Sequence, residues 1–130
     1  MSQQELEVIL ARQLAGYLAM PIFIVDPEGN LLFYNEPAEA ILGRRFEETG
    51  GMAAGEWATL FAPTDLKGTP LGPGELPLML ALAHGHPAHR RFCIRGLDGQ
   101  RRRIEVTAFP LIGQAGRNLG AVALFWEAKS

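Results

Sequence analysis

Three histidines lie close together in the sequence, as His84, His86 and His89. Neutral imidazole is the commonest side-chain metal ligand. A zinc site, however, needs four ligands, or three and a water, and no carboxylate lies close to these histidines along the chain. Gly85 and Pro87, which separate them, indicate a loop. We therefore predict solvated loop histidines and no metal site.

Residues that could act as nucleophiles are few. The only serines are Ser2 and Ser130, at the two ends of the chain, whereas a serine nucleophile must sit on a rigid, oriented element. Cys93 lies between Phe92 and Ile94, where a thiol behaves as a small hydrophobe, and a single cysteine forms no intrachain disulfide. Because no nucleophile, base and orienting group come together, we predict that the protein is not an enzyme.

The charges of the chain nearly balance, with 12 Lys and Arg against 14 Asp and Glu and a net charge of -2. This balance gives no overall attraction to nucleic acid or to anionic membranes. The run Arg101, Arg102 and Arg103 has two interpretations, a solvated strand edge or a site for phosphate or an acidic partner, and the first is favoured. No stretch approaches the length of a membrane span, and the polar, acidic N-terminus is unlike a signal peptide. The sequence thus predicts a soluble, cytoplasmic protein.

The elements that must position any site begin with an amphipathic helix. Across residues 3–18 the apolar side chains recur at spacings of three and four, which is typical of one helical face. That face consists of Leu6, Ile9, Leu10, Leu14 and Tyr17. We predict that residues 1–18 form this helix, which serves packing or dimerisation, and that residues 19–130 form one domain.

The next elements are predicted to be a β-hairpin and short helices. Two apolar runs, 21–26 and 31–34, flank a turn in which Pro27 presets one backbone angle and Gly29 supplies a positive φ. Asn35 is placed to cap a helix that ends at Gly43. Residues 44–75, rich in glycine and proline, are predicted to be irregular. A further helix is predicted over 76–83.

The last third of the chain changes to the alternating pattern of strands. Residues 89–95, 101–111 and 119–126 are predicted strands. The last is apolar on both sides, which places it at the centre of a sheet. Strands grouped together with helices between them indicate an α+β fold with an antiparallel sheet, and short connections favour hairpins.

Three segments in this order resemble the PAS family. They are residues 22–35, with an Asp, a turn Gly and a closing Asn; residues 92–111, with an Asp98-Gly99 turn; and residues 120–125. The resemblance implies a five-stranded antiparallel PAS-type sheet with short helices on one face. It also implies a small-molecule pocket between sheet and helices, and dimerisation through an N-terminal helix and the outer face of the sheet.

We predict a pocket lined by apolar side chains that face inward. The candidates are Ile24, Phe33, Ile41, Trp57, Phe61, Leu80, Phe92, Ile94, Val106 and Leu124. The alternative is that these residues simply fill the core. The Trp57 indole N–H needs an acceptor if buried, which is either a ligand or a backbone carbonyl.

The cofactor is left open, with haem and flavin both disfavoured. In haem-binding PAS domains a histidine near the end of the same helix ligates the iron, and His84 is the nearest candidate. The Asn-Cys-Arg motif of the flavin-binding light sensors is absent.

The resemblance favours a signal-transduction sensor that binds a small apolar ligand, dimerises, or does both. The alternative is a ligand-free dimerisation module. The chain ends soon after Trp126, without the Asp-x-Thr motif that often leads into an output domain. We therefore expect a free-standing homodimer that acts on a signalling partner in trans, or a piece of a larger protein.

Overall fold

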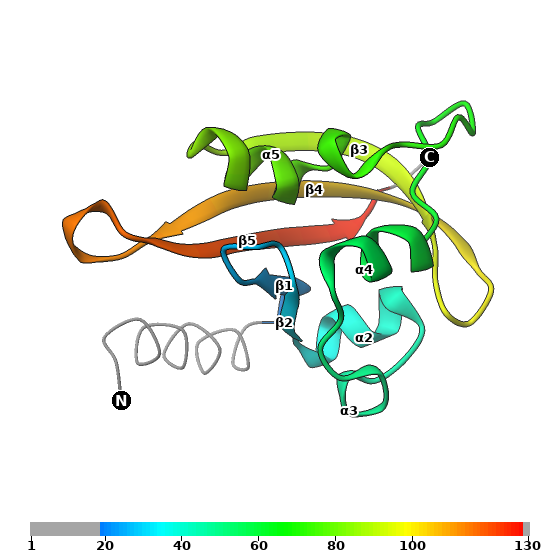
Figure 1. Ribbon diagram of the computed structural model, residues 1–130. Helices are drawn as coiled ribbons and strands as arrows, with labels where there is room; N and C mark the ends of the chain where they lie inside the picture. The colour runs from blue at the N-terminus through cyan, green and yellow to red at the C-terminus, as the bar shows by residue number, and fades with distance from the viewer. Residues whose placement is uncertain (1–18, 129–130) are drawn as a thin grey trace.

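The fold is built on one antiparallel sheet of five strands, in the order β2-β1-β5-β4-β3 (Figure 1). The structure is a computed structural model and describes residues 19–128. Its strands are β1 (Ile22–Val25), β2 (Leu31–Tyr34), β3 (Ala88–Arg95), β4 (Arg101–Ile112) and β5 (Asn118–Glu127). The predicted α+β fold is confirmed, and β5 lies at the centre of the sheet. The stripe Leu6, Ile9, Leu10, Leu14 and Tyr17 lies outside the described residues.

Short helices pack on one face of the sheet (Figure 1). They are α2 (Glu36–Leu42), α3 (Phe46–Thr49), α4 (Ala54–Leu60) and α5 (Pro77–His84), with 3-10 turns at Pro73–Glu75 and Gln114–Gly116. The predicted helix over 76–83 corresponds to α5. Helices α3 and α4 correct the prediction that residues 44–75 are irregular.

The β1–β2 hairpin closes through the turn that the sequence predicts. Gly29 has a φ of 87°, and the Asp26 carboxylate accepts the backbone N–H groups of Glu28 and Asn30 at 3.0 and 2.9 Å. Asn35 then caps α2, since its side-chain oxygen accepts the N–H of Ala38 at 3.3 Å. The hairpin and the start of α2 are thus held by local hydrogen bonds of the kind that short polar side chains make.

The sheet buries apolar side chains on both faces, because successive residues of a strand point to opposite sides. On the inner face, Phe23 and Val25 of β1 and Phe125 of β5 belong to the main core under the helices. On the outer face, Ile24 and Val122 belong to a second apolar cluster. Strands β1 and β5 therefore contribute apolar side chains to a cluster on each face of the sheet.

Strands β1 and β5 come close enough at one point that only glycine fits. Gly120 has a φ of 125°, and a Cβ at this position would overlap the carbonyl oxygen of Val25. L-residues with a side chain rarely adopt such an angle. The glycine allows Ala121 to pair with Val25 at the end of the ladder.

Candidate functional site

A pocket lies between the inner face of the sheet and helices α4 and α5. Its cavity volume is about 70 Å³. The side chains that line it are Phe23, Leu42, Trp57, Ala58, Phe61, Pro63, Leu76, Pro77, Leu78, Phe92, Ile94, Ile104, Val106, Ala123 and Phe125. All are apolar apart from the indole nitrogen of Trp57. The pocket therefore suits an uncharged, apolar molecule.

Trp57 contributes its ring to the pocket and directs its N–H elsewhere. The indole nitrogen donates to the carbonyl oxygen of Gly29 at 2.8 Å, and the ring meets Phe23 edge to face, with centroids 5.1 Å apart. The indole N–H, which needs an acceptor when it is buried, is therefore bonded to a backbone carbonyl. Trp57 thereby attaches the pocket-forming helix α4 to the turn of the β1–β2 hairpin.

The start of α4 is attached to the same turn. The Asn30 side-chain oxygen accepts the N–H of Ala54 at 3.1 Å, which satisfies one of the backbone donors that a helix leaves open at its first turn. Ala53 at the N-cap position offers no side-chain cap. The sequence gives no local sign of this helix, because its cap comes from another element.

The structure places the ten predicted pocket residues in three locations. Five of them line the pocket: Trp57, Phe61, Phe92, Ile94 and Val106. Three of them belong to the apolar cluster on the outer face: Ile24, Phe33 and Leu124. The remaining two do not line the pocket: Ile41 is part of the main core, and Leu80 is half-buried on α5.

The inward orientation expected for Ile24, Phe33 and Leu124 is therefore corrected. Strand β1 is buried at all four positions, so its sequence contains no alternation from which the inward side could be chosen. The pocket residues that sequence reasoning missed include Phe23 on β1 and Phe125 on β5. They also include Pro63 and Leu76, which lie between α4 and α5. Phe23 adjoins Ile24, and Phe125 adjoins Leu124. Shifting the expected alternation by one residue therefore places these two side chains on the inner face.

The apolar cluster on the outer face is a second candidate surface. It combines the buried side chains Ile22, Ile24 and Val122 with partly buried neighbours. These neighbours are Leu32, Phe33, Phe109, Leu111 and Leu124. We call these eight residues the outer apolar face. The part of this cluster that stays accessible comes from its five partly buried members, and a protein contact could cover it.

The histidines and the cysteine lie away from the pocket. His84 and His86 are exposed and stack with ring centroids 5.7 Å apart. Cys93 is buried but points away from Phe92 and Ile94, whose side chains line the pocket. Within residues 19–128, no three His, Cys, Asp or Glu side chains are grouped as a metal would require.

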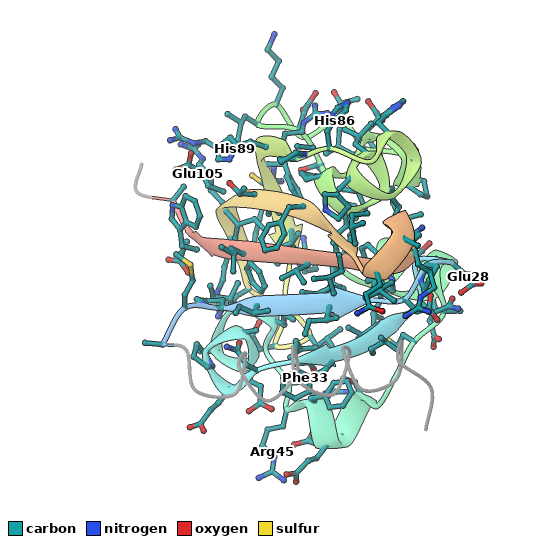
Figure 2. All side chains as sticks on the ribbon, turned by 90° about the vertical axis from the view of Figure 1, so that its left-hand side faces the viewer. Glu28, Phe33, Arg45, His86, His89 and Glu105 are labelled. Carbon is teal, nitrogen blue, oxygen red and sulfur yellow. The ribbon has the colours of Figure 1, made fainter. Side chains whose placement is uncertain are left out.

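His89 belongs to a polar cluster on the outer side of β3 and β4 (Figure 2). Its ring nitrogens contact the Thr107 hydroxyl at 2.7 Å and the Glu105 carboxylate at 3.3 Å. Arg91 pairs with the same carboxylate at 3.2 Å. Partial burial opposes ionisation of Glu105, but the hydrogen bonds from Arg91, His89 and Trp126 outweigh it and lower the pKa of the carboxyl group.

Arg102 joins the β3–β4 turn to α2. Its guanidinium donates to Asp98 at 2.8 Å and to the carbonyl oxygen of Ile41 at 2.9 Å, and its Nε lies 3.5 Å from a carboxylate oxygen of Glu127. The hydrogen bond from Arg102, followed by one from the backbone of Gln100, lowers the pKa of Asp98 to about 2. Asp98 therefore stays ionised, and the pair is a structural tie rather than a proton-transfer site.

A comparison with protein families identifies the family to which this fold belongs. The family model described as the PAS fold matches residues 18–129. The chain belongs to the PAS fold family. Members of this family are typically sensory modules, and the predicted resemblance to the family is confirmed. A search of curated proteins finds no match.

Solved PAS structures share the fold of this PAS domain at low sequence identity. The PAS domain of a protein from Colwellia psychrerythraea is 16% identical, with a TM-score of 0.66, over 94% of this chain and 97% of that one. The PAS domain of nitrogen regulation protein NR(II) from Vibrio parahaemolyticus is 15% identical, with a TM-score of 0.64, over 92% and 98%. A light-oxygen-voltage domain studied with a flavin analogue is 13% identical, with a TM-score of 0.67, over 95% and 85%.

The pocket of this PAS domain does not fit a flavin. Its volume is about 70 Å³, whereas sites for drug-sized ligands measure roughly 300–1,000 Å³. The lining offers no polar side chain for the ring edge and no cysteine for an adduct. His84 is also not among the lining residues, so the pocket holds no axial ligand for haem.

In the described part of the chain, no helix is long and apolar enough to cross a membrane.

Proposed function

We propose that this PAS domain senses a small, uncharged, apolar molecule in the pocket between its sheet and helices α4 and α5. The observation that supports this is the cavity of about 70 Å³ with an apolar lining. An apolar cavity of about 150 Å³ stays dry and binds benzene or xenon. The present pocket has about half that volume and is partly open, so the proposed ligand is a small apolar molecule.

The two-sided strands offer a route from pocket to surface. Phe23 and Ala123 line the pocket, while their strand neighbours Ile24 and Val122 belong to the outer apolar face. Because adjacent strand residues point to opposite sides, a ligand that displaces β1 or β5 also moves the outer apolar face. Packed interiors transmit such displacements rather than absorb them.

The experiment is a xenon titration followed by methyl NMR, since xenon is an apolar probe of suitable size. We expect shifts at Leu78, Ile94 and Val106, which line the pocket, and none at Ile112, which is exposed at the end of β4. Native mass spectrometry of the purified protein then asks whether a natural ligand is retained.

A cavity-filling variant tests the location of the binding. Ala58 lines the pocket, so Ala58→Leu should abolish the xenon shifts while the fold is kept. Ala83 is exposed on α5, and Ala83→Leu serves as the matched control. Binding that persists in Ala58→Leu, or shifts spread over the whole protein, would contradict the proposal.

A second candidate function is dimerisation through the outer apolar face. Its support is the partly buried ring of Phe33 and the partly buried Leu124, which lie beside the buried Ile24 and Val122. The predicted stripe of residues 3–18 would extend this interface. A signalling partner in trans would then respond to the dimer.

Analytical ultracentrifugation of the full chain tests this second function. We expect a dimer that Phe33→Lys converts to a monomer. Leu60 is 44% exposed on α4, and Leu60→Lys is the control that should leave the dimer intact. A monomeric full chain, or a dimer that persists in Phe33→Lys, would rule the interface out.

A further inference from the structure

Positive charge is concentrated on the β3–β4 hairpin. Six of the 12 Lys and Arg residues of the chain lie between positions 90 and 103, and Asp98 is the one acidic residue in that stretch. The Arg101–Arg103 run belongs to this concentration. Neither the pocket nor the outer apolar face includes any of these arginines.

Two of these arginines pair with carboxylates: Arg102 with Asp98 and Glu127, and Arg91 with Glu105. Arg90 forms no ion pair within residues 19–128, but it is the cross-strand partner of Val106, which lines the pocket, so it lies on the inner side of the sheet.

The other three are Arg95, Arg101 and Arg103, which we call the hairpin arginines. Within residues 19–128 none of them forms an ion pair: Arg95 donates to the Gly99 carbonyl at 3.4 Å and Arg101 to the Thr64 hydroxyl at 3.3 Å, both neutral groups. The side chains of Arg95 and Arg101 are exposed, and that of Arg103 is partly exposed. All three guanidinium groups are therefore available for an anion.

The register places the hairpin arginines on one face. Arg95 is the cross-strand partner of Arg101, and Cys93 is the partner of Arg103. Their strand neighbours Ile94 and Ile104 point into the pocket, so the hairpin arginines point to the outer side. Cross-strand partners lie roughly 5 Å apart, and like charges directly opposite are destabilising. The fold thus retains a repulsive arrangement that a negatively charged occupant would relieve.

We propose that the hairpin arginines bind a carboxylate-rich segment of a partner protein. Alternate residues along a strand are about 6.6 Å apart, which is also the spacing of alternate carboxylates in an extended peptide. Trp126, on the neighbouring strand, hydrogen-bonds to Glu105 beside this surface. The occupant would therefore meet cations with an aromatic ring at their margin, a combination common in protein interfaces.

Two other occupants are less suited to this surface. Nucleic acid is bound by neutralising many phosphates along a continuous backbone, and the hairpin arginines supply only three cations. A second copy would have to offer its acidic helices, around Glu47 and Glu48. That contact joins two different surfaces, and such head-to-tail pairing forms open filaments unless its rotation closes a ring.

The test is fluorescence anisotropy of the full chain with a labelled peptide of alternating glutamate and serine. We expect binding that weakens as salt is raised and no binding of the matching glutamine peptide. In the variant Arg101→Gln/Arg103→Gln, two exposed charge pairs are lost, so affinity should fall about five- to tenfold.

Arg44 and Arg45 provide the matched control, because they form an adjacent exposed pair held by Glu47 and Glu48. Figure 2 shows Arg45 far from His89 and Glu105. Arg44→Gln/Arg45→Gln should leave affinity unchanged, and far-UV circular dichroism should show that both variants are folded. Equal loss in the two variants, or no binding of the glutamate peptide, overturns the proposal.

A single-stranded DNA of the same charge separates the two kinds of anion. Weaker binding than that of the glutamate peptide supports a protein partner. DNA binding that is as tight and is lost in Arg101→Gln/Arg103→Gln overturns the carboxylate assignment. The pocket plays no part in this experiment, so its result is independent of the xenon titration.

Discussion

The side chain of Asn35 accepts the backbone N–H of Ile22 at 2.9 Å, so the first residue of β1 is held by the residue that caps α2. The same oxygen accepts the N–H of Ala38, and the amide nitrogen donates to the carbonyl oxygen of Met20 at 2.9 Å. Asn35 is only 1% exposed. One buried amide therefore joins the entrance of the sheet to the first helix.

Replacing Asn35 should destabilise the fold strongly. Asn35→Ala removes a helix cap, at about 0.5–2 kcal/mol, and leaves the N–H of Ile22 without its acceptor, at about 1–3 kcal/mol more. Asn35→Asp keeps the acceptor but sets a buried carboxylate oxygen against the carbonyl oxygen of Met20, so it should also destabilise. Urea unfolding measures both. Asn118 is exposed and contacts Gly120, and a loss in Asn118→Ala as large as in Asn35→Ala would contradict this account.

Trp57→Phe should cost about 1–3 kcal/mol, because it leaves the Gly29 carbonyl without its buried donor. The ring remains apolar, so the pocket wall is largely kept. Chemical unfolding monitored by far-UV circular dichroism avoids the loss of the fluorophore. The control is Trp126→Phe, since Trp126 is only half-buried on β5. Similar free energies of unfolding for the two variants would show that the Gly29 hydrogen bond carries no special weight.

Two glycine substitutions should have opposite effects. Gly120→Ala puts a Cβ against the Val25 carbonyl at a φ of 125° and should destabilise by at least about 2 kcal/mol. Gly55 lies within α4, and a Cβ there meets nothing within 4 Å. Gly55→Ala should therefore stabilise by about 0.5–1 kcal/mol. Thermal unfolding ranks the two variants against the parent chain, and a stable Gly120→Ala would refute the close approach.

The Asp98–Arg102 pair should make stability depend on acid pH. The pKa of Asp98 is about 2 in the folded chain against an ordinary 3.8. The unfolded chain therefore binds the proton first, and the stabilisation present above pH 4 is lost as the pH falls towards the folded pKa. The free energy of unfolding of Asp98→Asn should be lower at neutral pH and should vary less across this range. Glu56→Gln, on the exposed surface of α4, should follow the parent curve; if Asp98→Asn also runs parallel to the parent, the linkage is absent.

The sequence predicted the hairpin, α2, α5 and the three long strands because each is specified by neighbouring residues. The Asp26 turn and the Asn35 cap act over a few positions, and β4 shows the alternation of Ile104, Val106 and Ala108 directly. Where both faces of a strand are apolar, as in β1 and β5, that alternation disappears. Ile24 and Leu124 were consequently assigned to the wrong face, although their strands were predicted correctly.

The two helices that sequence reasoning missed start without local caps. The first N–H of α4 is accepted by Asn30, and the N–H of Phe46 at the start of α3 is accepted by the Glu39 carboxylate at 2.8 Å. Both acceptors belong to other elements. The N-cap positions of α3 and α4 are Arg45 and Ala53, neither of which is a capping residue type, so local rules predict a loop there.

Because the acceptors at the starts of α3 and α4 belong to other elements, they also imply an order of folding. A helix of four or seven residues is too short to persist alone, and α3 and α4 each need a partner group that is in place only after α2 or the β1–β2 turn has formed. We therefore expect the hairpin and α2 to form before α3 and α4 during folding. The walls of the pocket would then be completed last, and local unfolding that reopens them would leave the sheet intact.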